Sequence, residues 1–337
     1  MQTQVNSLRL LQRPRRNRKS EAIRMMVQET RLNTSNLVYP QFVMEGRGVR
    51  EPIQSMPGIY RKSVDLLLKE TERALELGIS AIALFPVIPR ELKDANGTEA
   101  TNPAGILPRA IHAIKEAFPQ ICVIADIALD PYTSHGHDGL IDEKGEVLND
   151  QTVERLAEMA LVQAYAGVDM VAPSDMMDGR VRFIRQTLDE EGYQQVSIHA
   201  YSAKYASCFY GPFREALFSE LSGSDKKGYQ MNPANRREAI LEARLDVNEG
   251  ADFLMIKPAL PYLDVIAKVR EATSLPVSAY QVSGEYAMIM AADQKGWLDG
   301  QKAFWESVLS IKRAGADVIF TYAAPLIAKM ITSGAHG

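Results

Sequence analysis

The chain has 337 residues, of which 46% are hydrophobic and 24% charged, so it contains enough apolar material for a sizeable core. A formal net charge of −4 argues against a protein that binds nucleic acid over its whole surface. No apolar stretch approaches the roughly 18 residues of a membrane span, and no apolar block precedes the N-terminal arginines. We therefore expect neither a membrane protein nor a secretory signal, and the two distant cysteines suit a reducing cytoplasm.

The first 31 residues carry eight basic side chains against two acidic ones. A basic arm can bind nucleic acid, but this one contains no aromatic side chain that could stack on bases. We therefore expect no nucleic-acid partner and interpret residues 1–33 as an arm for subunit contacts. Residues 34–337 are predicted to form one catalytic domain.

Beyond the arm, one pattern recurs along the chain: an amphipathic run, a glycine, and then a short apolar stretch. Its four copies are centred on Gly78, Gly167, Gly250 and Gly315. Glycine suits the position just after a helix, where the backbone often becomes left-handed. The pattern therefore predicts a repeated step from helix to buried strand.

Eight strands are predicted, and most are separated by helical stretches. They cover residues 37–43, 81–87, 122–128, 170–174, 196–202, 253–258, 276–282 and 318–322. This alternation favours a closed TIM (β/α)8 barrel, an α/β fold, and no glycine-rich phosphate fingerprint supports a dinucleotide-binding sheet. In such a barrel, reactive groups are expected where the strands end.

Two lysines stand at such positions. Lys257 ends an apolar run and is followed by Pro258, and Lys204 follows the strand predicted over residues 196–202. An ammonium at an apolar barrel mouth loses hydration, so its pKa falls and a free amine becomes available to attack a ketone. The simpler interpretation is that each is an ordinary surface lysine, but two at neighbouring strand ends favour catalysis.

Three carboxylates, Asp126, Asp130 and Asp138, lie in and just after the third predicted strand. Grouped carboxylates suit a hard cation such as Mg²⁺. The histidines of the same segment could bind a softer metal, although no thiolate accompanies them. The alternative is a solvated acidic loop.

Longer motifs point to a family. The lysines lie in YSAKYAS and MIKP, and PSDMMDGR, FYGPFREA and YQVSGEYAM occur in the same order as in that family. Over nearly its whole length the chain resembles the porphobilinogen synthase (5-aminolevulinate dehydratase) family. The resemblance implies a lyase that joins two 5-aminolevulinate molecules into porphobilinogen, a precursor of heme and chlorophyll, with loss of two waters. It implies Schiff bases on Lys257 and Lys204, which would hold the substrates that become the propionate and acetate sides.

The same resemblance assigns residues to the substrate carboxylates. On the Lys257 side these are Ser283, Tyr322 and Tyr280, and on the Lys204 side they are Arg214, Gln230 and Lys226, in a lid over about residues 211–230. Many family members have arginine in place of Lys226, and lysine lacks the two-pronged grip of a guanidinium. Asp126 and Ser174 are expected as further site residues.

Metal use is expected to differ from that of the zinc-using relatives, which carry three cysteines where this chain has Ala128, Asp130 and Asp138. The soft ligands that zinc prefers are thus missing. We therefore expect Mg²⁺ as the cofactor and no zinc. Asp130 and Asp138 could instead hold water, a monovalent cation or a substrate amine. The resemblance also implies an allosteric Mg²⁺ at Glu242, contacted by Asp175 through water, and a cytoplasmic homo-octamer assembled through the arms.

Other functions remain open at this level. One is a one-lysine class I aldolase-type barrel, which would not retain 5-aminolevulinate under borohydride. A metal-dependent hydrolase using the Asp/His segment would leave both lysines without a role. A non-catalytic barrel that binds a metabolite would be favoured if Lys257→Met left turnover unchanged.

Overall fold

The computed structural model describes residues 10–219, 221–222 and 225–334, and the chain divides into two compact units, Met1–Arg31 and Leu32–Gly337. The first unit contains a 3-10 helix, Pro14–Arg18, and the short helix α1, Glu21–Met26. Ser20 caps α1 by accepting a hydrogen bond from the Ile23 amide. Neither element contains a buried residue, so packing within this unit is slight.

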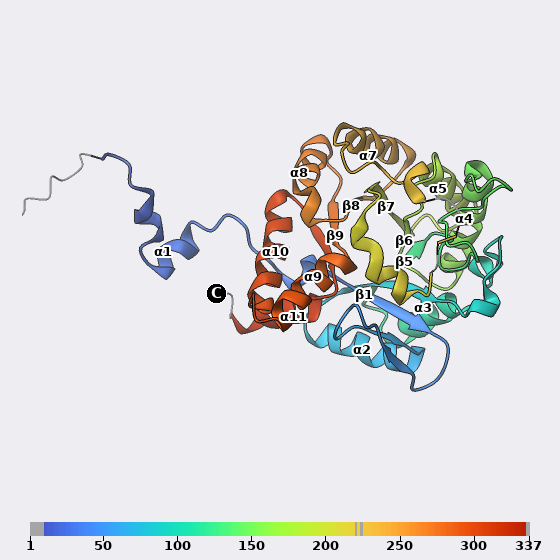
Figure 1. Ribbon diagram of the computed structural model, residues 1–337, viewed down its shortest axis with the longest axis horizontal. Coiled ribbons are helices and arrows are strands. Elements are labelled where there is room, and N and C mark those ends of the chain that lie inside the picture. The colour runs from blue at the N-terminus through green and yellow to red at the C-terminus, as the bar shows by residue number, and fades with distance from the viewer. Residues whose placement is uncertain (1–9, 220, 223–224, 335–337) are drawn as a thin grey trace, which may run out of the picture. The chain divides into compact units, whose positions relative to one another are not determined.

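The second unit is a closed parallel barrel (Figure 1). Its strands are β1 (Leu37–Met44), β4 (Ala81–Val87), β5 (Cys122–Ile127), β6 (Met170–Pro173), β7 (Ser197–Lys204), β8 (Phe253–Lys257), β9 (Val277–Gln281) and β10 (Val318–Thr321). They follow one another around the barrel in chain order, and β10 pairs with β1 to close it. The TIM (β/α)8 prediction is confirmed.

All eight predicted strands are present, with two differences. The strand predicted over residues 196–202 continues to Lys204 after a register irregularity between Ala200 and Ala203. A hairpin was also missed: β2 (Arg50–Pro52) pairs antiparallel with β3 (Tyr60–Lys62), which runs beside the end of β1. Three-residue strands of charged and polar residues leave no hydrophobic pattern by which to predict them.

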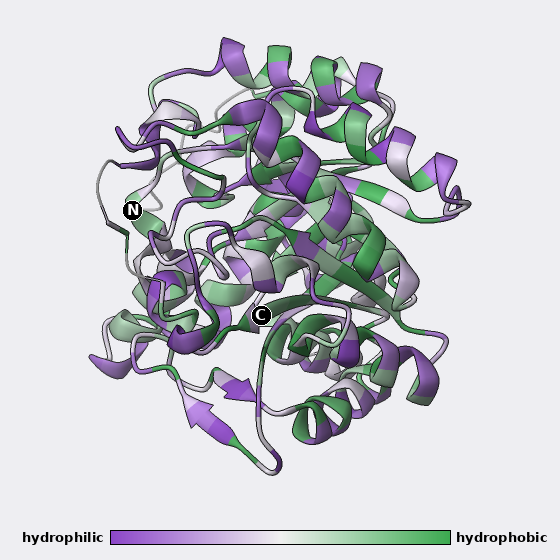
Figure 2. Cartoon of the chain, turned by 90° about the vertical axis from the view of Figure 1, so that its right-hand side faces the viewer, coloured by the Kyte–Doolittle hydropathy of each residue, from purple (hydrophilic) through white to green (hydrophobic). Residues whose placement is uncertain are grey.

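Helices surround the strands. The outer layer consists of α2 (Val64–Glu76), α3 (Ile106–Ala117), α4 (Asn149–Tyr165), α5 (Arg180–Glu190), α7 (Arg237–Glu249), α8 (Leu263–Ala272), α10 (Gly300–Ala314) and α11 (Ala324–Ser333). Two further helices lie in βα loops: α9 (Ser283–Gln294) follows β9 directly, and α6 (Gly211–Ala216) follows β7 after the 3-10 helix Cys208–Tyr210. Figure 2 shows hydrophobic residues along the strands and polar residues on the outer helical faces. Within the described part of the chain, no helix is both long and apolar enough to cross a membrane.

The repeated glycine pattern has a structural role at each copy. All four glycines have positive φ at the step from helix to strand. In three copies the aspartate two residues later accepts a hydrogen bond from a backbone amide at the start of the neighbouring strand. The pairs are Asp169 with Val123 (2.8 Å), Asp252 with Ile198 (2.7 Å) and Asp317 with Val277 (3.0 Å). The pattern thus ties adjacent strands together at the end of the barrel opposite the lysines.

Candidate active site

The two lysines end neighbouring strands at the same level of the barrel. Lys204 and Lys257 are the last residues of β7 and β8, and they are direct partners in the parallel pairing. Only 6% and 5% of their surfaces are exposed. The expected pair of lysines at the barrel mouth is therefore present, and both are buried, which excludes the interpretation as ordinary surface lysines.

Lys257 lies in an aromatic environment. Its Nζ is 4.6–5.3 Å from the ring centroids of Tyr201, Tyr210, Phe213 and Tyr280. Burial and the neighbouring charge of Lys204 lower the pKa of Lys257 to about 7, although Asp126 opposes the shift. A substantial fraction of Lys257 is therefore the free amine at neutral pH, the form that attacks a ketone.

Lys204 has different partners. Its Nζ donates to Asp138 Oδ2 at 2.8 Å and to the backbone carbonyl of Ser174 at the end of β6. Asp138 is fully buried. Burial alone would favour its neutral form, but Lys204 and Lys226 hold the pKa of the Asp138 carboxyl well below its usual value. The two lysines thus occupy unlike surroundings, one apolar and one ionic.

The second ammonium on Asp138 belongs to Lys226, in the segment expected to form a lid. Lys226 Nζ donates to Asp138 Oδ1 at 2.5 Å and to Asp130 Oδ2 at 3.3 Å. Burial opposes the charge of Lys226, but the two carboxylates raise its pKa. No three His, Cys, Asp or Glu side chains of the described residues gather closely enough to hold a metal ion. The expected three-carboxylate ligand set is therefore not formed: Asp130 and Asp138 face a lysine ammonium, and the donor set as arranged does not fit a divalent ion.

Asp126, at the end of β5, completes the charged part of the site. Its Oδ1 is buried without a hydrogen-bond partner in the described structure. Burial and the nearby charge of Asp130 raise the pKa of Asp126 to about 7, while Lys257 and Lys204 act in the opposite direction. This carboxyl can therefore exchange a proton near neutral pH.

The residues expected on the Lys257 side come from three elements. Tyr280 of β9 and Tyr322 after β10 are buried, and their hydroxyls are 2.9 Å apart. Ser283 begins α9 and its Oγ accepts from the Phe213 amide at 3.0 Å. The next residue is Gly284, where an added Cβ would lie 2.5 Å from the Phe209 carbonyl oxygen. Glycine thus permits the segment after Lys204 to pack against α9.

The lid residues are brought to the same place. Gln230 is buried and its Nε2 lies 3.5 Å from Asp138 Oδ2. Arg214, in α6, is exposed, but it lines a small cavity together with both catalytic-candidate lysines, Lys226 and Gln230. That cavity has a volume of about 30 Å³, room for only water-sized groups. The predicted residues of the Lys204 side therefore converge, in a tightly packed arrangement.

Comparisons with known proteins place this geometry in a family. Residues 11–330 match the family described as delta-aminolevulinic acid dehydratase. The chain is 56% identical over 330 residues to the delta-aminolevulinic acid dehydratase of Chlamydia pneumoniae, covering 98% of this chain and 99% of the relative. The chain belongs to the delta-aminolevulinic acid dehydratase family.

Further relatives of the delta-aminolevulinic acid dehydratase family agree. The enzyme of that name from Bradyrhizobium diazoefficiens is 55% identical over 331 residues, covering 97% of this chain and 93% of the relative. The crystal structure of the Toxoplasma gondii ME49 enzyme in complex with the reaction product porphobilinogen superimposes with a TM-score of 0.95 at 54% identity. It covers 97% of this chain and 93% of that one. The sequence-based family assignment is confirmed.

The residues expected to form the allosteric site of this dehydratase lie beside β6 and α7. Glu242 is half-buried and lines a hollow of about 330 Å³ that Asp178 and Glu238 also line. Carboxylate oxygens are ligands that Mg²⁺ prefers, but in the described residues these three are not gathered closely enough to hold an ion. Asp175 is fully buried and faces Arg180, with Nε to Oδ2 at 3.9 Å. Asp175 does not line the hollow, so any contact with an ion there is indirect.

Sequence reasoning missed two residues that position the dehydratase site. The Tyr229 hydroxyl accepts from the Asp138 amide at 3.2 Å and lies 3.2 Å from His137 Nδ1. Glu285 is fully buried and its carboxylate accepts from the amides of Val282, Leu260 and Ala259, which fixes the segment following Lys257. Tyr229 lies in the segment expected to form a lid, and Glu285 lies in the motif YQVSGEYAM. Neither position in the sequence reveals a partner that is so distant along the chain.

The pKa of Lys257 leads to a prediction about pH. Because only the unprotonated amine reacts, kcat/KM should rise from pH 6 to pH 8 with a midpoint near the Lys257 pKa of about 7. Asp126 opposes the lowering of this pKa, so Asp126→Asn should move the midpoint to lower pH. The measurement is the pH profile of kcat/KM for both proteins. A midpoint that stays or moves upward in Asp126→Asn would contradict the assignment.

Proposed function

We propose that this chain is a porphobilinogen synthase that condenses two 5-aminolevulinate molecules into porphobilinogen with loss of two waters, using Lys257 and Lys204. The observation that carries the proposal is the pairing of two buried lysines on adjacent strands at one level of the barrel. Each substrate is a ketone, and a Schiff base activates a ketone either as an electrophile or, through its enamine, as a nucleophile. Membership of the family supports the same reaction.

The atoms balance if both lysines react and both are released. Each amine adds to a substrate ketone, and each ketone oxygen leaves as water, which accounts for the two waters. The new C–C bond and the new C–N bond between the substrates each replace one bond of a C=N group. Each lysine then leaves as an amine when a carbon-bound proton is lost and a double bond of the ring forms. Holding both reactants on one protein removes much of the entropic cost of their encounter.

The surroundings of the lysines suggest unequal tasks. Lys257, with a pKa of about 7, supplies free amine without help. Lys204 donates to Asp138, which fixes the orientation of its side chain. Tyr280, Tyr322 and Ser283 supply hydroxyl donors for one substrate carboxylate. Arg214, Lys226 and Gln230 supply charged and amide donors for the other.

The direct test is a colorimetric assay for porphobilinogen with purified protein and 5-aminolevulinate. We expect product, and we expect borohydride to trap labelled substrate on the protein. A one-lysine aldolase-type enzyme would retain no label from this substrate. Absence of both product and trapped label would refute the proposed function.

We further propose that Mg²⁺ regulates the enzyme at Glu242 and that zinc is not used. Asp130 and Asp138 both accept hydrogen bonds from Lys226. This supports a reaction centre in which lysines supply the positive charge. The alternative is that a monovalent cation binds beside these two carboxylates. After treatment with EDTA, activity should be restored by Mg²⁺ and not by Zn²⁺. Glu242→Gln should lose the response to Mg²⁺ and keep basal activity. Rescue by Zn²⁺ alone would contradict this proposal.

The arm is proposed to make subunit contacts in a homo-octamer. Its support is the exposure of large apolar side chains in residues 10–31, including Leu11 (94% exposed) and Met26 (81%). We propose a cytoplasmic location because the chain is similar to a bacterial relative. Some plant relatives are named as chloroplastic.

A further inference from the structure

Strand β7 contains one extra residue shortly before Lys204. Ala200 pairs with Leu254 of β8. The next pair is Ala203 with Ile256, which is three residues further along β7 but only two residues further along β8. An extra residue of this kind is a β-bulge, and bulges often re-aim the side chains that follow them. The bulge therefore lies at the position from which it can turn Lys204.

The extra residue decides which way Lys204 points. The His199 ring contacts the Phe320 ring of β10 across the barrel, with 5.1 Å between centroids, and the centroid of the Tyr201 ring lies 5.1 Å from Lys257 Nζ. Both side chains therefore face the interior. In a regular strand the odd-numbered residues would share that face, and Lys204 would point outward. Because of the bulge, Lys204 instead lines the small cavity together with Lys257.

The backbone of the bulge is bonded to Arg180. Arg180 is the first residue of α5 and is buried. Its Nη2 donates to the backbone carbonyl of Tyr201, within the bulge, at 3.2 Å, and its Nη1 donates to Asp246 Oδ1 of α7 at 2.9 Å. Helices α5 and α7 pack against each other and against β7 (Figure 1). One guanidinium thus joins both helices to the irregular part of the strand.

The same guanidinium faces the segment that accepts a hydrogen bond from Lys204. Lys204 donates to the backbone carbonyl of Ser174, and Asp175 is the next residue. Asp175 is buried, and its Oδ2 lies 3.9 Å from Arg180 Nε. Met176 follows with φ +68°, a strained conformation that persists only where surrounding contacts hold it. Both segments beside Lys204 therefore depend on the Arg180 charge or hydrogen bonds.

We propose that Arg180 is a positioning residue for the reaction: together with Asp246, it holds the bulge of β7 that turns the Lys204 amine into the site. Arg180 does not line the small cavity between the lysines, so it acts through the backbone of β7 and not on the substrate. A buried ion cluster often adds little stability compared with apolar side chains of similar volume. Holding the bulge is the property that this cluster supplies. This inference rests on the proposed function, because it concerns the reactivity of Lys204.

The test replaces the ion pair by apolar side chains in the double variant Arg180→Met/Asp246→Leu. Such a replacement can preserve stability, but it leaves no donor for the Tyr201 carbonyl. We expect urea unfolding close to that of the wild type and kcat lower by about tenfold or more, since small displacements of a reactive group reduce the rate. Arg180→Lys keeps a cation beside Asp246. It has one nitrogen in place of the two that now donate, so it should lose less kcat than the double variant.

Borohydride trapping of labelled 5-aminolevulinate separates positioning from general damage. Label trapped at Lys257 should stay at the wild-type level in both variants while porphobilinogen formation falls, because Lys257 forms its Schiff base without Lys204. Arg270→Met is the control. Arg270 also donates to a carbonyl (Leu275, 3.2 Å) and to a carboxylate (Asp317, 2.8 Å), but at the opposite end of the barrel. Its loss should leave kcat unchanged.

Two results would overturn the role of Arg180. One is wild-type kcat in both the double variant and Arg180→Lys, because the bulge would then need no guanidinium. The other is a parallel fall of kcat, label at Lys257 and folded protein, because Arg180 would then serve stability alone. A wild-type protein that makes no porphobilinogen and traps no label would instead refute the proposed function itself.

Discussion

Lys257→Met should abolish turnover, with kcat lower by about 10⁴-fold or more, because no other group at that position can form a Schiff base with the substrate. Methionine preserves the length and apolar character of the side chain, so the aromatic surroundings of Tyr201, Phe213 and Tyr280 should still pack. The assay is porphobilinogen formation, together with borohydride trapping of labelled 5-aminolevulinate. Label bound at Lys257 should disappear with activity.

A matched control is available in Lys62→Met. Lys62 is as buried as Lys257, at 5% exposure each, and burial lowers its pKa to about 8. Its Nζ donates to Gln41 at 2.9 Å, so it does not contact the site of the two lysines. Lys62→Met should keep kcat at the wild-type level even if stability falls. If both variants lost the same activity, the loss would come from removing a buried lysine in general, and not from removing the nucleophile.

Asp138→Asn should have the second largest effect, on both activity and stability. The carboxylate accepts from Lys204 at 2.8 Å and from Lys226 at 2.5 Å. Without it, two buried ammonium groups lose their common counter-charge, and breaking a buried pair in this way costs about 3 kcal/mol or more. We expect kcat to fall by about 10²-fold, because Lys204 loses both its orientation and its nearest proton acceptor. Urea unfolding and the porphobilinogen assay measure the two effects.

Asp130→Asn is the comparison for this prediction. Asp130 contacts Lys226 at 3.3 Å, and none of its hydrogen bonds in the described residues reaches Lys204. Its loss should therefore cost less stability and less activity than the loss of Asp138. Equal effects of the two substitutions would show that the pair acts as one anionic unit, contrary to the separate roles assigned here.

The barrel itself could be predicted because its determinants are local. Each strand is a short apolar run, and each copy of the glycine pattern combines a helix end with the strand that follows it. The positions of Lys204 and Lys257 could be predicted for the same reason, since a polar residue that ends a buried parallel strand lies at the barrel mouth. The hairpin of β2 and β3 was not predicted, because strands of three residues are too short to show a periodic pattern.

The partners of the carboxylates could not be predicted, because they depend on contacts between distant segments. Asp130 and Asp138 were expected to hold an ion, a water or a substrate amine, and in the structure both bond to Lys226, which is 88 residues beyond Asp138. The spacing of aspartates says how many negative charges are present, but it does not say which cation lies opposite them. Tyr229 and Glu285 were missed for the same reason.

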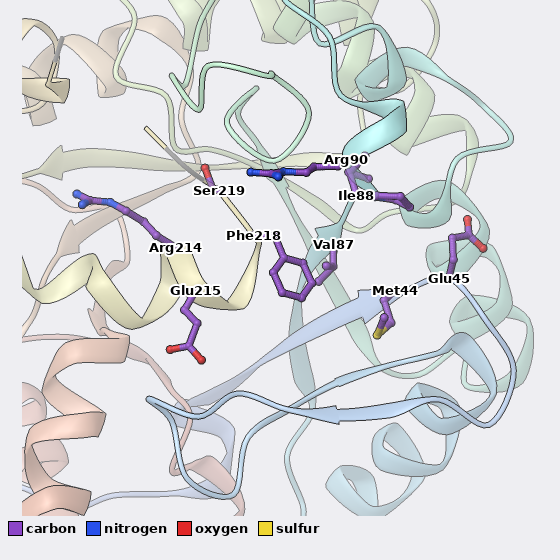
Figure 3. A pocket seen from close by; sticks show the side chains of 10 residues that line it. Met44, Glu45, Val87, Ile88, Arg90, Arg214, Glu215, Phe218 and Ser219 are labelled. Atoms are coloured by element: carbon purple, nitrogen blue, oxygen red, sulfur yellow. The ribbon is translucent and has the colours of Figure 1, made fainter. Parts of the chain in front are cut away.

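By itself, then, the sequence determined the fold, the positions of the two lysines at the strand ends and, through its long motifs, the family. Only the tertiary structure decided that Lys257 lies among aromatic rings with a lowered pKa while Lys204 lies in an ionic cluster. It also decided that a cavity of about 720 Å³ lies beside α6 (Figure 3), whereas the cavity that both lysines line has only about 30 Å³. The physical reason is that strand periodicity and helix ends act over a few residues, whereas solvation, charge pairing and cavities arise from segments that meet only when the barrel closes.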